Sequence, residues 1–432
     1  MSFAMFSPTA GEPEVTPLPL GRYRKSEALL RKAQRLIPGG HHLSGRPLLT
    51  PETSPMYMER GEGCRVWDVD GHEYLDYIGA YGPCLLGYAH PVVDAAAIRQ
   101  IRNGALLSLN HPLHVAFAER LTELLTGGEM AAFFKTGSEA TTAALRVARR
   151  ATGRRKVVRC GYHGWHDWCL PGEPFVPEMG EQVLSFDPRR SASLSEILQQ
   201  HPHEVAAVIV APEMILPTSQ AVFAQLVEAT HRAGAVFILD EVKTGLRIRP
   251  GFFQQYVGIV PDLTTLSKAL GNGWPVAALV GSRAIMEHGA GLHISATYHG
   301  ETAGIAAALA TLDIVQQEDV CGHVWRLGEM LIDGLNHLAV FHGIPAKAYG
   351  EPLPPMPFLR FSVRDPELTQ ALENTFYSEL YVAGILFHPR HLWFISYAHR
   401  MGDIERTLEA ADKALRVTAE RHGAELARGL SP

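Results

Sequence analysis

The chain has 432 residues, more than one compact domain usually contains, so its length predicts two packed units, one of them large and α/β. Apolar residues make up 46% of the chain and charged residues 19%, which excludes intrinsically disordered and fibrous proteins. The net charge of -6 offers no basic surface for nucleic acid or anionic lipid, so we expect no nucleic-acid partner.

The cysteines and the N-terminus indicate the cellular setting. The cysteines are scattered without a Cys-x-x-Cys pair, so neither disulfides nor a zinc site are expected. Residues 1–21 lack the basic start and apolar stretch of a secretion signal. No window reaches the ~18 consecutive apolar residues of a membrane-spanning helix. These observations predict a protein of the reducing cytoplasm that does not enter a membrane.

The pattern of apolar residues predicts a small antiparallel unit near the start of the chain. After a loose arm, residues 26–36 have helical spacing, and a loop that carries Arg46 follows. Residues 56–60, 64–69 and 73–77 then alternate around glycine turns, which predicts an antiparallel meander.

A different rhythm begins near Pro91 and continues to Ile314. Helical runs alternate there with short, continuous apolar runs at 131–134, 205–210 and 235–239. Strands of this kind are buried on both faces, so they predict a mostly parallel sheet. Ligands of such sheets bind beyond the carboxyl ends of the strands.

The last part of the chain predicts a second lobe, which the N-terminal meander joins. Helices and strands are expected there at 302–317, 324–337, 358–361, 392–396 and 403–421. The expected organisation has three regions. Residues 1–90 form the arm and part of a small domain, residues 91–322 form the large domain, and residues 323–432 complete the small one.

The first candidate site is a strand that ends in a glycine and continues directly into a helix. Gly137 and Ser138 stand at that junction, and alanines at helical spacing follow until Gly153. Free backbone N–H groups and the helix dipole make such a junction an anion site, so it predicts a phosphate seat. Taken alone, Ser138 is explained as well by a simple N-cap.

Two further residues follow buried strands. Asp240 comes directly after an apolar run, where a carboxylate is poorly solvated and needs a cationic partner such as a protonated pyridine nitrogen. Lys268 ends another apolar run and precedes a glycine-rich turn, and its amine can form an imine with an aldehyde. A phosphate seat, a ring-nitrogen acid and an amine are together what pyridoxal 5'-phosphate requires.

The whole chain resembles the class III aminotransferases, specifically the branch that contains glutamate-1-semialdehyde 2,1-aminomutase and D-phenylglycine aminotransferase. The segments that carry the resemblance occur in the family's order at 37–40, 69–79, 82–83, 86–91, 161–164, 240–242 and 267–268. The resemblance implies the fold of fold type I pyridoxal-phosphate transferases. That fold has a mostly parallel sheet in a large domain and a small α+β domain made from both chain ends.

The resemblance also implies roles for single residues. Lys268 would hold the cofactor as a Schiff base and Asp240 would face its ring nitrogen, while Tyr162 and Val242 would cover the two ring faces. The remaining expected cofactor contacts are Thr136, Gly137 and Ser138 at the phosphate, His163 in the Tyr-His-Gly segment, and Thr297. The family supplies this threonine from the second subunit, so the resemblance implies a homodimer.

Two residues are expected on the substrate side. Arg46 stands where the aminomutase branch keeps an arginine for the substrate carboxylate, and a forked guanidinium suits that task. Tyr81 is expected to line the substrate pocket. His163 with His166 and Asp167 could suggest a metal, but this segment matches the family's own, so we expect no metal.

The chain also departs from the aminomutases. Residues 162–187 are shorter than the gating segment of those enzymes, and residues 388–393 replace a stretch that contains a glutamate. Ala211 stands where most class III enzymes have an acid before proline, which indicates altered substrate choice. Arg390 or Trp393 could supply a different contact.

These residues predict an aminotransferase that moves an amino group from a donor to a keto or aldehyde acceptor by a ping-pong mechanism. An aminomutase-like isomerase or a racemase/epimerase on the same cofactor is the alternative. A non-catalytic relative is disfavoured because both the lysine and the acid are present.

Overall fold

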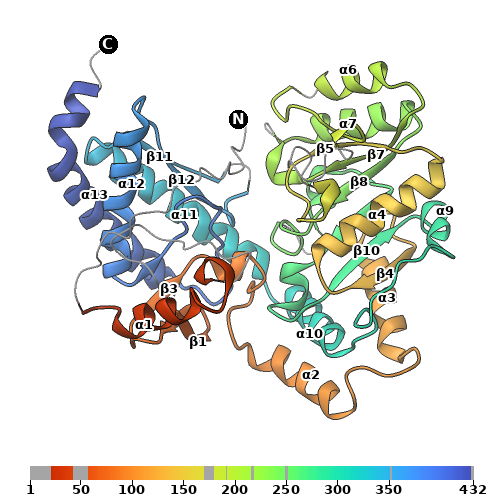
Figure 1. The fold of residues 1–432 in the computed structure, drawn as a ribbon, viewed down its shortest axis with the longest axis horizontal. Coiled ribbons are helices and arrows are strands. Elements are labelled where there is room, and N and C mark those ends of the chain that lie inside the picture. Colours follow the sequence, from red (N-terminus) through yellow and green to blue (C-terminus); the bar gives the residue numbers. More distant parts are fainter. Residues whose placement is uncertain are drawn as a thin grey trace.

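The computed structural model describes residues 21–41, 57–169, 180–190, 192–215, 218–248, 252–350 and 353–429. The chain forms two lobes, and Figure 1 shows that its first and last parts make one lobe while its middle part makes the other. Arg46 lies outside the described residues.

The larger lobe is built on a seven-stranded sheet in the order β4-β10-β9-β8-β7-β5-β6. Its strands are β4 (Met130–Phe134), β5 (Lys156–Cys160), β6 (Val183–Ser185), β7 (Val205–Val210), β8 (Val236–Asp240), β9 (Leu263–Leu266) and β10 (Ala277–Gly281). Only β10 runs antiparallel to its two neighbours, and the other pairs are parallel. The prediction of a mostly parallel sheet is confirmed.

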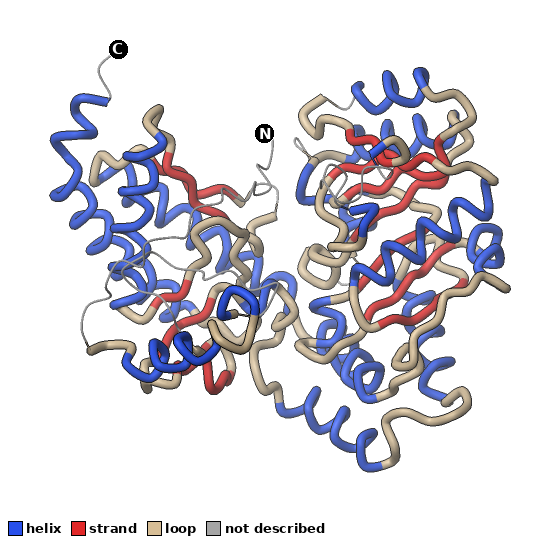
Figure 2. Tube along the Cα trace, in the orientation of Figure 1, coloured by secondary structure: helices blue, strands red, loops and turns tan. Residues whose placement is uncertain are grey.

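Helices cover both faces of this sheet (Figure 2), which explains why every residue of β7, β8, β9 and β10 is buried. The helices are α2 (Pro91–Arg102), α3 (Pro112–Leu124), α4 (Gly137–Thr152), α6 (Ala192–Gln200), α7 (Gln220–Arg232), α8 (Phe253–Val257), α9 (Arg283–Met286) and α10 (Ala303–Gln317). The predicted helix at the phosphate seat is α4, and Gly153 ends it with a φ of 68°.

The smaller lobe joins the two ends of the chain. A four-stranded sheet has the order β1-β2-β3-β13, and a two-stranded sheet pairs β11 with β12. The strands are β1 (Met58–Glu62), β2 (Arg65–Asp68), β3 (Glu73–Asp76), β11 (Ala346–Tyr349), β12 (Phe358–Phe361) and β13 (Ile385–Leu386), and the helices are α1 (Arg24–Ala33), α11 (Val320–Phe341), α12 (Pro366–Val382) and α13 (Met401–Gly429). The antiparallel meander is confirmed, and β13 adds to it in parallel beside β3.

The predicted strand at 392–396 is wrong. These residues form an extended loop: the N–H groups of Trp393 and Ile395 donate to Pro357 and Pro355. A proline has no backbone N–H, so this neighbour cannot return the bonds of a strand pair, and the Phe394 N–H bonds to Tyr77 instead. The side chains of Trp393, Phe394 and Ile395, which suggested a strand, are buried in this loop. No helix among the described residues is long and apolar enough to cross a membrane.

Candidate active site

Lys268 lies just after β9, at the start of a 3-10 turn over Lys268–Gly271. Its Nζ donates a hydrogen bond to the carbonyl oxygen of Tyr81 at 2.9 Å. The φ of Lys268 is 46°, and those of Ala80 and Tyr81 are 53° and 67°. Residues with a side chain rarely adopt this left-handed region, and they keep it where the surroundings hold the backbone, often at functional sites. The lysine is therefore fixed in one place and is not a mobile surface charge.

The pKa of Lys268 is lowered to about 7, first by burial and then by the nearby cation of Lys243. The carboxylates of Glu213 and Asp240 act in the opposite direction. A large fraction of this amine is therefore uncharged near neutral pH. An uncharged amine can attack a carbonyl or accept a proton.

Asp240, at the end of β8, is 4% exposed and is held by three donors. Its Oδ1 accepts from the Thr265 hydroxyl at 3.0 Å and from the Val242 N–H at 3.1 Å, while its Oδ2 lies 2.6 Å from His163 Nδ1. The His163 ring is buried and stacks on Trp168. These bonds fix the orientation of the carboxylate, and Thr265 lies directly opposite it on β9.

The N-terminus of α4 is the place where the sequence predicts an anion seat. The N-cap is Thr136, not Ser138: its hydroxyl accepts from the Glu139 N–H, and the Glu139 side chain returns to the Thr136 N–H. This capping box uses the Thr136 hydroxyl. Among the described residues, the N–H groups of Gly137 and Ser138 have no acceptor, so they remain available to an anion.

Two glycines let neighbouring segments approach this helix start closely. A Cβ at Gly137 would lie 2.9 Å from a methyl group of Val242, so only glycine lets the helix start and Val242 meet. A Cβ at Gly164 would collide with Ser138 Oγ, which places the segment after Tyr162 against the helix start. The structure thus brings together the N-terminus of α4, the Val242 side chain and the loop that follows Tyr162.

A buried ion pair beside Lys268 was missed by the sequence analysis. Glu213 Oε1 lies 2.6 Å from Lys243 Nζ, and their side chains are 5% and 13% exposed. The Lys243 Nζ is also 5.7 Å from the centre of the Tyr162 ring. Glu213, two residues after Ala211, places a carboxylate close enough to act on the charge of Lys268. Both residues follow the ends of buried strands, which was the available signal.

Removing the charge of Lys243 or of Glu213 should change the pKa of Lys268. Lys243→Met keeps the side-chain length and removes the charge that disfavours protonation of Lys268, so the pKa of Lys268 should rise. The measurement is the rate of reductive methylation of Lys268 against pH in the cofactor-free protein, followed by mass spectrometry. The midpoint should move to higher pH in Lys243→Met. Glu213→Gln, which removes a charge that favours protonation, should move it to lower pH, and equal midpoints in all three proteins would contradict this.

Tyr81 lies on the other side of Lys268 and faces two histidines of the loop that follows β13. Its ring centre is 5.7 Å from that of His388 and 5.2 Å from that of His391. Arg390 is exposed and bonds to Gln370. Tyr81 thus lies beside Lys268, and the histidines of this loop are the residues that face it.

Trp393 and Arg247 are buried groups near this loop. Trp393 is fully buried, stacks on Phe387 at 3.7 Å and donates to the His388 carbonyl oxygen, so it offers no ring to a substrate. Arg247 is 1% exposed and lies over the Phe394 ring, and its Nη1 and Nη2 have no partner among the described residues. Burial lowers the pKa of Arg247 to about 10.

The expected contact at Thr297 is not assembled within one chain. Thr297 is exposed on the loop that precedes α10, beside the exposed ring of Tyr298. Arg46 lies outside the described residues, so its expected place stays a prediction.

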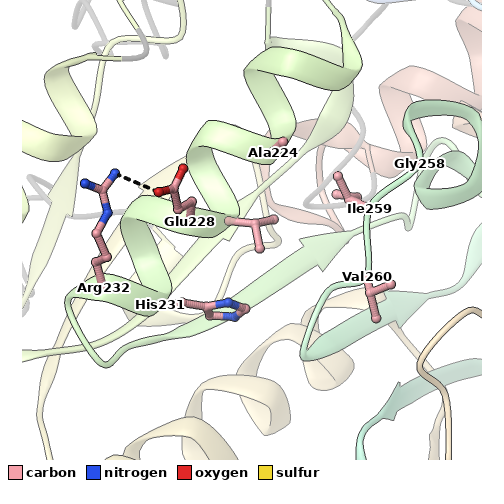
Figure 3. A pocket seen from close by; sticks show the side chains of 8 residues that line it. Ala224, Glu228, His231, Arg232, Gly258, Ile259 and Val260 are labelled. Atoms are coloured by element: carbon pink, nitrogen blue, oxygen red, sulfur yellow. Dashed lines mark ion pairs between the residues drawn. The ribbon is translucent and has the colours of Figure 1, made fainter.

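A surface hollow of about 610 Å³ lies elsewhere, lined by α7 and residues 258–260 (Figure 3). Its polar groups already have partners: Glu228 pairs with Arg232 at 3.6 Å, and His231 Nε2 lies 2.9 Å from Asp262 Oδ2. No group is left there to converge on a reacting molecule, so the chemistry belongs to the edge of the sheet at Lys268.

Comparison with known proteins agrees with this geometry. The 3-aminobutyryl-CoA aminotransferase of Cloacimonas acidaminovorans is 34% identical over 402 residues, which are 90% of this chain and 96% of that protein. The 2'-deamino-2'-hydroxyneamine transaminase of Streptomyces kanamyceticus is 39% identical over 321 residues, 74% and 81% of the two chains. The glutamate-1-semialdehyde 2,1-aminomutase of Desulforamulus reducens is 34% identical over 428 residues, 92% and 99%.

A solved structure extends the likeness to the fold. The FumI protein of Sphingopyxis sp. MTA144, in its pyridoxal-phosphate internal aldimine form, superposes with a TM-score of 0.87 and 29% identity over 93% of this chain and 98% of its own. Residues 50–347 match the model of the family "Aminotransferase class-III". The predicted fold type and cofactor are therefore confirmed. The chain belongs to the class III aminotransferases, enzymes that depend on pyridoxal phosphate.

Proposed function

We propose that this aminotransferase moves an amino group between a donor and a carbonyl acceptor with Lys268 as its central base and Asp240 as the partner of the cofactor ring. One observation carries the proposal. A lysine whose pKa is lowered and a carboxylate held by three donors follow neighbouring strands, β9 and β8, of one parallel sheet. Ligands of such sheets bind at this edge.

The residues present suit pyridoxal phosphate. Gly137 and Ser138 offer free N–H groups for its phosphate, with Thr136 beside them. Asp240 would bond to the ring nitrogen, and His163 holds Asp240 from behind. These residues would form the two ends of the cofactor site. Lys268 would be covalently attached to the aldehyde carbon.

The faces of the ring have candidates as well. Val242 packs against Gly137, and Tyr162 presents a half-exposed ring on the Gly164 side of the helix start. We propose that these two side chains enclose the ring. They would hold it in one plane while Lys268 acts on the reacting carbon.

Lys268 and Asp240 then divide the chemistry. Bound pyridoxal phosphate supplies an aldehyde for the amino group and a ring that accepts the electron pair of the reacting C–H bond. The Nζ of Lys268 would accept the proton of that bond and carry it to the carbon that held the aldehyde oxygen. The negative charge of Asp240 would favour the protonated form of the ring nitrogen. Two such half-reactions give ping-pong kinetics.

The test of this function is a half-reaction. Enzyme loaded with pyridoxamine phosphate is mixed with a panel of keto acids, ketones and aldehydes, and the products are identified by mass spectrometry. Release of a free amine or amino acid, with return of the carbonyl form of the cofactor, is the expected result. If no carbonyl compound takes up the amino group, the enzyme does not transfer amino groups between molecules.

Intramolecular transfer is the second candidate because an aminomutase is among the relatives. In that case, incubation of the pyridoxamine form with an amino aldehyde would yield an isomer and no second product. The shorter segment after Tyr162, which would retain a diamino intermediate less well, favours the aminotransferase.

We also propose that Arg46 binds the carboxylate of one substrate. A charge-assisted hydrogen bond of this kind contributes about 1.5 to 3 kcal/mol. Arg46→Ala should therefore raise the KM for carboxylated donors about tenfold or more. The kcat should change less, and the KM of uncharged amines should stay the same. An unchanged KM for carboxylated donors would remove Arg46 from the substrate site.

A homodimer in which Thr297 reaches the partner's cofactor is part of the proposal. Thr302 bonds to the Ala105 carbonyl oxygen through its N–H and its hydroxyl, which ties the Thr297 loop to the segment before α3. That segment exposes apolar side chains, among them Leu107 and Leu109, the latter 85% exposed. Apolar patches of this kind mark interaction sites.

The dimer is tested by sedimentation and by subunit mixing. Thr297→Val should weaken cofactor affinity about tenfold, as expected for one lost hydrogen bond to a charged group. Dimers formed from Thr297→Val and Lys268→Ala chains should contain one impaired site that combines both changes and one site with neither. After mixing, the sites with neither change should be active and bind the cofactor with wild-type affinity. Weakened affinity at every site that keeps Lys268 would contradict sharing across the interface.

Domain limits and location complete the proposal. We propose a large domain over residues 91–322, and the start of α11 at Val320 supports the second limit. The chain ends on either side would form the small domain. We place the protein in the cytoplasm because the cysteines, all five of them free and buried, suit a reducing compartment.

A further inference from the structure

The rings of His388 and His391 lie next to Tyr81, whose backbone holds Lys268. The Tyr81 carbonyl oxygen accepts from Lys268 Nζ at 2.9 Å, and the Tyr81 ring meets His388 and His391 edge to face. The two histidine ring centres are 5.6 Å apart, and that of His391 is 5.9 Å from that of Phe394. Both histidines are half-buried, so their ring nitrogens can still contact a substrate on this side of Lys268.

The backbone fixes a different tautomer for each histidine. His391 Nδ1 lies 2.8 Å from the Leu392 carbonyl oxygen, which can only accept, so Nδ1 carries the proton. His388 Nδ1 accepts from the Arg390 N–H at 3.0 Å, so its proton is on Nε2. The free nitrogen of His391 is therefore an acceptor and that of His388 a donor. Neither Nε2 has a hydrogen-bond partner among the described residues.

Both rings are neutral at physiological pH. Burial, followed by the cation of Arg390, lowers the pKa of His388 to about 4. Burial also lowers the pKa of His391 to about 3, against the Leu392 carbonyl, with Lys243, Lys268 and His388 adding to the decrease. The nearby cations repel an ammonium group. A hydroxyl can donate to the bare Nε2 of His391 and accept from the Nε2–H of His388, so hydroxyl groups match both neutral rings.

The loop that carries the histidines is rigid enough to discriminate. The N–H groups of Trp393 and Ile395 bond to Pro357 and Pro355, and that of Phe394 bonds to Tyr77. The Trp393 Nε1 also donates to the His388 carbonyl oxygen at 2.8 Å. Rings that are held in this way keep their donor and acceptor in place. Selection by unsatisfied polar groups is strong in such sites, because a substrate that lacks the matching group leaves them unpaired.

We propose that His391 and His388 select a substrate with hydroxyl groups flanking the reacting carbon, the His391 Nε2 accepting from one hydroxyl and the His388 Nε2–H donating to another. The proposal rests on the proposed aminotransferase function. It names the chemical class of the second substrate, which has no carboxylate for Arg46 to bind. The occupant is an amino polyol or amino sugar, or the corresponding ketone or aldehyde.

The test uses two amines of the same shape. In 2-amino-1,3-propanediol two hydroxyls stand where 3-aminopentane has methyl groups, and conversion of the cofactor is followed in single turnover. The wild type should prefer the diol at least about tenfold in kcat/KM, as two hydrogen bonds imply. His391→Phe keeps the ring and removes the acceptor, so it should reduce the preference to less than about threefold. The exposed His337→Phe, on α11, is the matched control and should leave the preference unchanged.

Failure of hydroxyl selection and failure of the aminotransferase function give different results in this test. Equal rates with both amines in the wild type, or an unchanged preference in His391→Phe, would overturn the selection of hydroxyls and leave the aminotransferase intact. No amino transfer from any amine would reject the proposed function instead. If His391→Phe does not fold, ¹⁵N NMR of the wild type decides. The diol should shift the unprotonated Nε2 of His391, and no shift, or the opposite tautomer, would contradict the proposal.

Discussion

Lys268→Ala should reduce turnover by about 10⁴-fold or more, because it removes both the attachment of the cofactor and the base that moves the proton. The visible absorbance of the lysine-bound cofactor should disappear. Cofactor should still bind non-covalently, since the seat at Gly137 and Ser138 and the carboxylate of Asp240 are unchanged. Stopped-flow single turnover and absorbance spectra measure these effects.

Two controls make the Lys268 prediction specific. Lys347→Ala removes an exposed lysine on β11 and should leave activity unchanged. Added methylamine should restore part of the proton transfer in Lys268→Ala, because a small amine can occupy the space of the missing Nζ. A mutant that kept the absorbance band and the full rate would show that another lysine, such as the nearby Lys243, holds the cofactor.

Asp240→Asn should slow the proton-transfer step by about 10²- to 10³-fold, the usual cost of removing one electrostatic contact to developing charge. The shape of the side chain is kept, so attachment of the cofactor to Lys268 should persist. The charge that holds a proton on the ring nitrogen is lost. Single-turnover rates with an amine deuterated at the reacting carbon report this step, and the isotope effect should increase.

Substitutions of the residues that bond to Asp240 should give smaller effects than Asp240→Asn and serve as its controls. Thr265→Val removes one of its three donors and leaves the other two, so the rate should fall by only about tenfold. His163→Phe keeps the stack on Trp168 and removes the donor to Oδ2, which should give an intermediate effect. Near-normal single turnover in Asp240→Asn would reject its role at the ring nitrogen.

The sequence by itself determined the sheet, the family and the main candidates for the chemistry. Lys268, Asp240 and Gly137 each follow a short apolar run, and such runs are local patterns that can be recognised without the tertiary structure. The carboxyl ends of parallel strands meet at one edge, so these local signals also predicted that the three residues lie together. The order of the phosphate seat, the acid and the lysine along the chain then predicted the cofactor.

Only the tertiary structure decided which groups surround the lysine. Glu213 and Lys243 are 30 residues apart in the chain, and Tyr81 belongs to the N-terminal part while His391 belongs to the C-terminal part, so no local pattern pairs them. The loop at 392–396 has the composition of a strand, yet its N–H groups find three different carbonyl partners in the packed lobe. Contacts of this kind depend on packing between distant segments. Backbone hydrogen bonds there set the tautomers of His388 and His391, and burial keeps both rings uncharged, which composition does not reveal.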